Sequence, residues 1–221
     1  MSEKNALTRH SSLVTRIGIL GGTFDPPHFG HLRLAEAALT QLSLDKVLFA
    51  PVGVQPLKQD HPATTPEHRA RMVELAIADD PRFALSRADL DRPGPHYTVD
   101  LLVIIQHQYP DAALWFIMGE DSLGDLLRWR DPARVIQLAR LAVLRRPGYE
   151  PDWAALERAL PDLRTRIDWI AHAEIDISAS NIRQRVRRGL PLAPFVPARV
   201  IDYLVAQRLY TDSSASTAEP A

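Results

Sequence analysis

The chain of 221 residues contains no cysteine. This absence excludes disulfides, zinc sites built from thiolates and catalysis by a thiol nucleophile. Lysine is also scarce, because only Lys4, Lys46 and Lys58 occur, and arginine supplies nearly all of the 26 basic side chains. Codon usage is the simplest explanation of this imbalance. The alternative is recognition of phosphate, since the planar guanidinium group matches phosphate oxygens.

The sequence also lacks a large net charge and long apolar runs. The formal net charge is −1, which argues against bulk nucleic acid or an anionic membrane as the main partner. Apolar runs such as Ala112–Met118 are far shorter than the ~20 residues of a membrane-spanning helix. Residues 1–15 contain no apolar stretch typical of a secretory signal. We therefore expect a cytoplasmic protein that binds neither nucleic acid nor a membrane.

Short apolar runs alternate with stretches of helical periodicity along the chain. The expected strands cover residues 16–20, 46–51, 82–85, 113–118, 140–144, 167–171 and 175–177. The expected helices cover residues 30–42, 66–78, 98–108, 132–139, 153–160, 180–188 and 197–207. This alternation predicts an α/β fold, with a Rossmann-like parallel sheet, helices on both faces and a small C-terminal helical portion.

No linker rich in proline, glycine or serine divides the middle of the chain. We therefore expect a single domain over residues 16–209, with flexible tails at residues 1–15 and 211–221. Open α/β sheets bind their ligands at the carboxyl ends of the strands, near the switch point. The residues that follow the expected strands are accordingly the candidates for chemistry.

The segment Gly21–His31, GGTFDPPHFGH, follows the first strand and opens the first helix. Its two leading glycines permit close approach of the backbone to a ligand. The helix start offers free N–H groups and the positive end of the helix dipole to an anion. His28 and His31 are three residues apart and therefore share a helix face. Two imidazoles at this place suit a polyphosphate, because each can donate a hydrogen bond to it.

Other interpretations of this segment stay open. The two histidines could bind a metal ion, although no third ligand follows at helical spacing, or they could be ordinary packing residues. The segment lacks the Gly-Lys-Ser/Thr of a P-loop and does not fit the G-x-G-x-x-G dinucleotide pattern.

A second candidate anion site is the stretch Ile177–Arg183, ISASNIR, before a helix near the C-terminus. We expect Ser180 to be the N-cap of that helix and Arg183 to lie in its first turn, which together would form an anion cradle. The alternative is an ordinary capped amphipathic helix with solvated arginines.

The two stretches resemble the signatures of the nucleotidyltransferase superfamily. His28–His31, HFGH, is similar to its T/H-x-G-H motif, and ISASNIR is similar to its I-S-x-T-x-I-R motif, with Ser180 in place of the usual threonine. Further segments extend the resemblance to bacterial nicotinate-nucleotide adenylyltransferases over residues 16–209. They are Pro95–Thr98, Phe116–Leu123 with Trp129, and Arg145–Tyr149.

This resemblance implies transfer of AMP from ATP to nicotinate mononucleotide, with release of pyrophosphate in the synthesis of NAD. It implies catalytic roles for His28, His31 and Arg183. It implies an ATP site of Gly21, Gly22, Thr23, Phe24, His28, His31, Gly119, Asp121, Ser178, Ser180 and Arg183. It implies a nicotinate mononucleotide site of Lys58, Tyr97, Thr98, Trp129, Arg145 and Arg146. Mg²⁺ would arrive with ATP, and no protein cage for a metal is expected.

Several of these residues have a second interpretation. Tyr97 and Trp129 could stack on a pyridine ring or could be core aromatics. Thr98 is a plausible helix N-cap. Asp121 could accept hydrogen bonds from a ribose or could cap a helix. Leu57 stands where related enzymes often carry histidine, which leaves the contacts of the Lys58 loop open.

Three rival functions are also open. One is a related enzyme, a pantetheine-phosphate adenylyltransferase or a glycerol-phosphate cytidylyltransferase. Another is a nucleotide-binding regulator without catalysis, and the third is a nucleic-acid-binding protein that uses its arginines. Assembly into a homo-oligomer is likewise left open by the sequence.

Overall fold

The computed structural model describes residues 14–53, 64–171 and 177–211. Its centre is a six-stranded sheet in the order β3-β2-β1-β4-β5-β6, in which every neighbouring pair is parallel. The strands are β1 (Arg16–Gly22), β2 (Lys46–Pro51), β3 (Phe83–Leu85), β4 (Ala113–Gly119), β5 (Arg140–Leu144) and β6 (Ile167–Ile170). This arrangement confirms the predicted Rossmann-like α/β fold.

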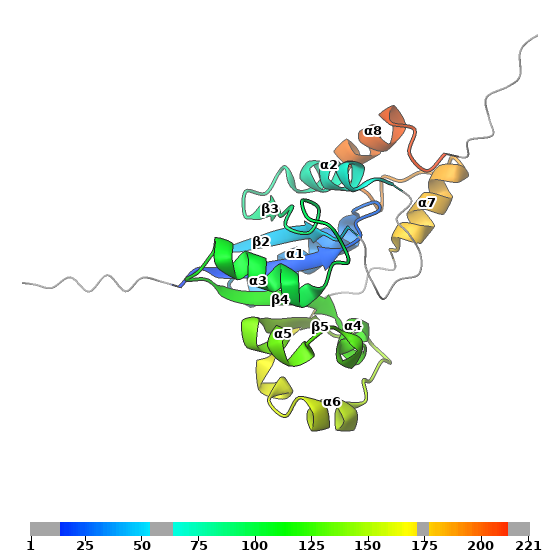
Figure 1. The fold of residues 1–221 in the computed structure, drawn as a ribbon. Coiled ribbons are helices and arrows are strands. Elements are labelled where there is room, and N and C mark those ends of the chain that lie inside the picture. Colours follow the sequence, from blue (N-terminus) through cyan, green and yellow to red (C-terminus); the bar gives the residue numbers. More distant parts are fainter. Residues whose placement is uncertain (1–13, 54–63, 172–176, 212–221) are drawn as a thin grey trace, which may run out of the picture.

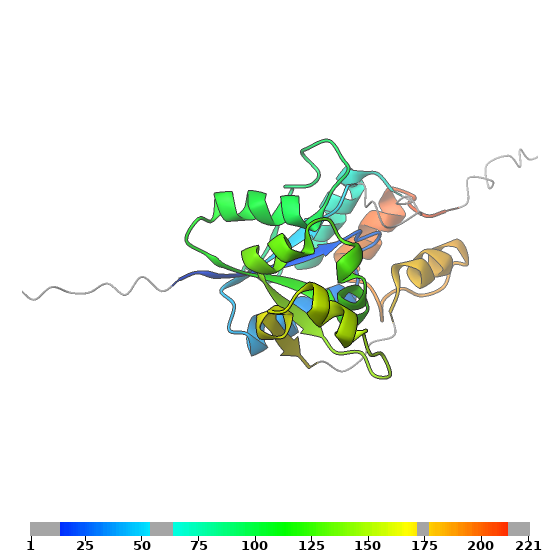
Figure 2. The ribbon, with the colours of Figure 1, turned by 60° about the horizontal axis from the view of Figure 1, so that its bottom comes forward.

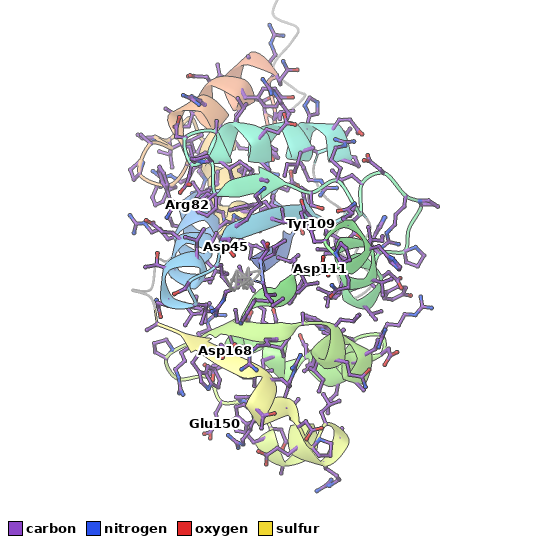
Figure 3. The ribbon with its side chains drawn as sticks, turned by 90° about the vertical axis from the view of Figure 1, so that its left-hand side faces the viewer. Asp45, Arg82, Tyr109, Asp111, Glu150 and Asp168 are labelled. Carbon is purple, nitrogen blue, oxygen red and sulfur yellow. The ribbon has the colours of Figure 1, made fainter. Side chains whose placement is uncertain are left out.

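The helices cover both faces of the sheet, as Figure 3 shows by placing α1 and α3 on opposite sides of it. They are α1 (Phe29–Gln41), α2 (Pro66–Ile77), α3 (Thr98–Gln108), α4 (Glu120–Gly124), α5 (Pro132–Leu138), α6 (Trp153–Ala159), α7 (Ala179–Arg187) and α8 (Ala198–Ala206). Two short 3-10 helices, η1 (Leu126–Arg128) and η2 (Leu163–Arg166), complete them.

Alternation along the strands divides the core into two layers. Ile17 and Ile19 of β1 belong to the layer covered by α3, α4, α5 and α6. Leu20, at the end of the same strand, belongs to the layer covered by α1 and α2. A third cluster, which includes Met72 of α2 and Ile182 of α7, joins α7 and α8 to α2. Figures 1 and 2 show these two C-terminal helices beside α2, away from α5 and α6.

The order of the strands creates a switch point between β1 and β4. The chain runs from β1 outward through β2 to β3, and then returns to place β4 on the other side of β1. The loops that leave β1 and β4 therefore diverge to opposite faces of the sheet, which opens a crevice at the carboxyl ends of these strands. The amino ends, which face the viewer in Figure 3, carry Asp45, Arg82 and Asp111 just before β2, β3 and β4.

Most expected elements are confirmed, with differences at their ends. Strand β1 continues to Gly22, because both glycines pair with β2. The periodicity did not predict α4, η1 or η2, which are too short to show it. The expected strand over residues 175–177 mostly lies outside the described residues, and Ile177 itself belongs to no strand. Within the described part of the chain, no helix combines the length and apolar character that crossing a membrane requires.

Candidate active site

A cavity of about 270 Å³ lies at the switch point, where the carboxyl ends of β1, β2 and β4 meet the start of α3. Its lining brings together six of the residues that the sequence singled out, from separate segments of the chain. They are Gly21, Gly22, His31, Thr98, Gly119 and Trp129. The cavity therefore joins the first motif to the segments expected to bind the acceptor.

Phe24, in the loop after β1, supports the ring of His31. The side chain of Phe24 is buried, and its expected part in the ATP site stays a prediction. The ring of Phe24 packs against that of His31 in a T-shaped arrangement, with 4.9 Å between their centroids. It also lies against Gly22, where a Cβ atom would come within 3.1 Å of it. A side chain at position 22 would therefore crowd the Phe24 ring that supports the histidine.

His28 and His31 form a stacked pair at the start of α1. Their ring centroids are 3.7 Å apart, and the main-chain N–H of His28, the N-cap residue, donates to Nδ1 of His31 at 3.2 Å. Because Nδ1 accepts, the neutral ring of His31 carries its proton on Nε2. Of the two rings, that of His31 lines the cavity.

Burial gives His28 a different acid–base behaviour from that of an exposed histidine. His28 is only 7% exposed, and this burial lowers its pKa from 6.5 to about 4. His28 is accordingly neutral near pH 7. Its Nδ1 atom is buried and has no hydrogen-bond partner among the residues that the structure describes.

The second motif starts its helix earlier than expected. Ser178, not Ser180, is the N-cap of α7, and its Oγ accepts from the main-chain nitrogen of Asn181 at 3.1 Å. The prediction of Ser180 was wrong because the sequence Ser-Ala-Ser offers two hydroxyls, and local pattern does not choose between them. Ser180 lies within the first turn and accepts from Nη2 of Arg183 at 3.2 Å.

Arg183 connects the two motifs. Its Nη1 donates to the main-chain oxygen of Asp25 at 2.7 Å, across 158 positions of sequence. The start of α7 and the loop that precedes α1 therefore lie together, although none of Ser178, Ser180 and Arg183 lines the cavity described above. Asp25 lies within the first motif, but the sequence pattern predicted no role for it.

The end of β4 carries a small charged cluster. Asp121 is exposed in the first turn of α4, where Gly119 is the N-cap, so the alternative of Asp121 as a helix cap was wrong. A Cβ on Gly119 would overlap the Asp121 carboxylate, which pairs with Nη1 of Arg146 at 3.6 Å. The buried carboxylate of Glu120, which the sequence did not single out, accepts from the main-chain nitrogen of Arg146 at 2.8 Å.

The aromatic candidates for the acceptor differ in placement. Trp129 lines the cavity and packs against Phe116 in a T-shaped arrangement, with 5.7 Å between the ring centroids. Tyr97 lies under the guanidinium of Arg130, 4.8 Å from its ring centroid, and is the N-cap of α3. Thr98 is the first helical residue, so its expected capping role was wrong. Its neighbour takes that place because Tyr97 has the extended backbone that an N-cap requires.

Arg145 does not line this cavity. Arg145 stacks over Trp169, with 4.2 Å between the guanidinium carbon and the ring centroid. It lines a different cavity of about 460 Å³, together with Tyr149, Trp153 and Trp169. Lys58 lies outside the described residues. The roles expected for Arg145 and Lys58 stay predictions.

Three buried polar residues near the cavity were given no role from the sequence, although His96 lies within the segment Pro95–Thr98. Asp89 and His96 are buried and line the cavity, and burial raises the pKa of Asp89. Arg69 of α2 is 0% exposed and donates from Nη1 to the main-chain oxygens of Thr23, at 2.9 Å, and Val52, at 2.5 Å. Its position three residues before the buried Met72 was the available signal, since that spacing places arginine on an apolar face.

Similarity to known proteins agrees with this geometry. A family model described as "Cytidylyltransferase-like" matches residues 19–185. A Herpetosiphon aurantiacus protein named "Probable nicotinate-nucleotide adenylyltransferase" is 44% identical over 195 residues, which cover 88% of this chain and 98% of that protein. A Thermomicrobium roseum protein of the same name is 45% identical over 197 residues, which cover 89% and 92% of the two chains.

Solved structures share the fold. A Plasmodium falciparum nicotinic acid mononucleotide adenylyltransferase complexed with NaAD matches with a TM-score of 0.71 and 20% identity, over 89% of this chain and 97% of that chain. A structure of the Plasmodium falciparum protein complexed with APC matches with a TM-score of 0.69 and 19% identity, over the same shares of the two chains.

Proposed function

The chain belongs to the nicotinate-nucleotide adenylyltransferase family, and we propose that its switch-point cavity transfers AMP from ATP to nicotinate mononucleotide. An oxygen of the mononucleotide phosphate forms a bond to the α-phosphorus of ATP. The bond between that phosphorus and the oxygen bridging to the β-phosphate breaks, so pyrophosphate leaves and nicotinate adenine dinucleotide remains. The observation that carries this proposal is the contact from Arg183 to the main-chain oxygen of Asp25, which brings the two phosphate motifs together.

His31 is the residue proposed to stabilise the α-phosphate. Its Nδ1 is occupied by the main-chain N–H of His28, so Nε2–H is the donor directed to ligand. A preorganised donor acts most strongly where charge develops in the transition state. His28 holds His31 by stacking and adds a second imidazole at the positive end of α1. Gly21, Gly22 and the main chain near Thr23 would form the wall of this part of the site.

Arg183 and the start of α7 are proposed to hold the β- and γ-phosphates. The first turn of α7 presents main-chain N–H groups and a positive dipole end. The Ser180 hydroxyl orients the Arg183 guanidinium. The positive charge of this group would then stabilise the leaving pyrophosphate. Ser178 contributes by capping the helix. Gly119 and Asp121, at the end of β4, would receive the adenosine, with the carboxylate accepting from ribose hydroxyls.

The acceptor is proposed to lie between Trp129 and the first turn of α3. The indole of Trp129 lines the cavity and offers a face to a pyridine ring. Main-chain N–H groups at the start of α3, beginning with Thr98, favour a carboxylate over a neutral amide because the helix dipole is positive there. This argument supports nicotinate mononucleotide as the acceptor. Lys58, Tyr97 and Arg146 are further proposed contacts.

The reaction needs no protein nucleophile, so positioning and charge stabilisation supply the catalysis. Mg²⁺ is proposed to enter with ATP. In residues 14–53, 64–171 and 177–211, no group of three or more metal-ligating side chains is placed to hold an ion. Triphosphate oxygens and water suit Mg²⁺, which keeps several of its water ligands.

A panel of acceptors with ATP and Mg²⁺ tests the proposal. The panel contains nicotinate and nicotinamide mononucleotides, phosphopantetheine and glycerol phosphate, and pyrophosphate release is followed for each. Nicotinate mononucleotide should give nicotinate adenine dinucleotide and pyrophosphate in equal amounts, with the highest kcat/KM of the panel. Absence of pyrophosphate release would overturn the activity. Equal kcat/KM for the acid and the amide would overturn the argument from the start of α3.

A further inference from the structure

The carboxylate of Asp25 lies at the centre of a buried polar cluster next to the phosphate motifs. Asp25 is only 2% exposed. It accepts from the hydroxyl of Thr64 at 2.6 Å and from the hydroxyl of Tyr210 at 2.6 Å. A buried carboxylate without hydrogen-bond partners would be costly, so these two donors hold the side chain in one orientation.

The main chain of the same residue serves the phosphate site. The oxygen of Asp25 accepts from Nη1 of Arg183 at 2.7 Å, while Nη2 of Arg183 reaches Ser180. Asp25 therefore accepts a hydrogen bond from Tyr210 on its side chain and one from Arg183 on its main chain. A displacement of the Asp25 main chain would move the acceptor that fixes the Arg183 guanidinium, and the bonds to the Asp25 carboxylate oppose such a displacement.

Tyr210 comes from the far end of the described chain, 185 positions after Asp25. Its ring packs against the cluster that joins α2, α7 and α8, and its hydroxyl also lies 4.0 Å from Sδ of Met72. Burial and the neighbouring Asp25 carboxylate raise the pKa of Tyr210 well above its usual value. The hydroxyl therefore stays protonated and donates to the carboxylate across the whole working pH range.

Arg69 holds the other side of the loop. It is fully buried and donates to the main-chain oxygens of Thr23 and Val52. Burial lowers the pKa of Arg69, and the negative charge of Asp25 opposes this lowering. The loop before α1 is thus fastened from α2 by Arg69 and from the C-terminal segment by Tyr210.

We propose that Asp25 and Tyr210 are positioning residues for Arg183, so that the C-terminal segment completes the site that holds the leaving pyrophosphate. This inference rests on the proposed function. Tyr210 does not line the switch-point cavity and acts through Asp25, whose main-chain oxygen sets the direction of the Arg183 guanidinium. Loss of the Tyr210 hydroxyl should weaken the handling of the phosphates of ATP and leave the binding of nicotinate mononucleotide unchanged.

A double-mutant cycle between Tyr210→Phe and Arg183→Gln tests this coupling. Tyr210→Phe keeps the ring and removes only the donor, and we expect kcat/KM for ATP to fall about tenfold. The KM for nicotinate mononucleotide should change less than twofold. In the Arg183→Gln background the same tyrosine substitution should change kcat/KM for ATP less than twofold, because the residue through which Tyr210 acts is gone.

Tyr203→Phe is the matched control, since the hydroxyl of Tyr203 on α8 lies 2.9 Å from Nδ1 of His68 and does not reach Asp25. It should leave kcat/KM unchanged in both backgrounds. The inference is overturned if Tyr210→Phe leaves kcat/KM for ATP unchanged, or lowers it by the same factor in both backgrounds.

Pyrophosphate binding, measured by calorimetry, separates this inference from the proposed function. Tyr210→Phe should weaken binding of pyrophosphate about tenfold in the presence of Arg183. An unaltered protein that forms no dinucleotide would overturn the proposed function alone. Equal pyrophosphate affinity of the unaltered protein and Tyr210→Phe would overturn the positioning role alone.

Discussion

The imidazole rings of His28 and His31 stack with their centroids 3.7 Å apart and their planes 22° from parallel. Two charged rings at this distance would repel each other strongly. The pair is therefore compatible with only one charge, and His28 is the ring that stays neutral, because burial lowers its pKa to about 4. His31 is the ring that lines the cavity.

The pKa of His28 makes stability depend on pH. Because the folded-state pKa is lower than the usual 6.5, the unfolded chain takes up this proton first as the pH falls. The free energy of unfolding should decline between pH 7 and pH 4 by about 3 kcal/mol from this group. Below about pH 4 both states are protonated at this site, and the decline from His28 ends.

Urea unfolding of His28→Gln at pH 7 and at pH 4 measures this contribution. The variant should lose less stability over that interval than the unaltered protein does. His107→Gln, at an exposed position near the end of α3, should keep the original pH dependence. An identical loss of stability in His28→Gln and the unaltered protein would refute the role of His28.

Removal of the His31 imidazole should mainly affect the chemical step. We expect His31→Ala to lower kcat for AMP transfer about 10²–10³-fold, because a preorganised donor to the α-phosphate is lost. Steady-state pyrophosphate release measures the change, with His107→Ala as the control outside the cavity. Full turnover by His31→Ala would exclude this histidine from the phosphate site.

Trp129 should matter for the acceptor and not for ATP. Stacking of a base on an aromatic ring is worth ~1–3 kcal/mol, so Trp129→Ala should raise the KM for nicotinate mononucleotide about 10- to 100-fold. The KM for ATP should change little. Trp153→Ala alters a tryptophan of the other cavity and serves as the control; a comparable increase from that substitution would contradict a specific role for Trp129.

Arg69 should contribute to stability in spite of its charge. Arg69→Met leaves the buried main-chain oxygens of Thr23 and Val52 without the donor that now reaches both. We expect the free energy of unfolding to fall by about 2–3 kcal/mol. Arg71→Met, on the same helix but in an exposed pair with Glu74, should change it by less than about 0.5 kcal/mol. Equal stabilities of the two variants in urea unfolding would contradict this account.

Local pattern predicted the type and order of the longer elements well, and their ends less well. The helix Thr98–Gln108 and the strand Arg140–Leu144 begin and end where periodicity placed them. Helix α7 does not, because one hydrogen bond from the main-chain nitrogen of Asn181 to the Ser178 hydroxyl decides where it starts. Helix α4 has only five residues, which is too few for a helical period to show.

The residues of the site likewise divide into those that local sequence pattern could relate to one another and those that it could not. Residues that are close in sequence, such as His28 and His31, could be assigned together because helix geometry relates them directly. Asp89 and His96 could not, since their place on the cavity follows from how the segment between β3 and α3 packs against β2. In the sequence, Arg69 is one of several charged residues of the same helix. The structure shows that it is buried and that it donates hydrogen bonds to two loops.

The sequence by itself determined the strand–helix alternation, the two phosphate motifs and the resemblance that they carry, because each depends on residues within a few turns of one another. Only the tertiary structure decided that Arg183 meets Asp25 and that Tyr210 holds it from the other side. Those contacts join positions more than 150 residues apart. They depend on how α7 and α8 pack on α2, and no local periodicity specifies that packing.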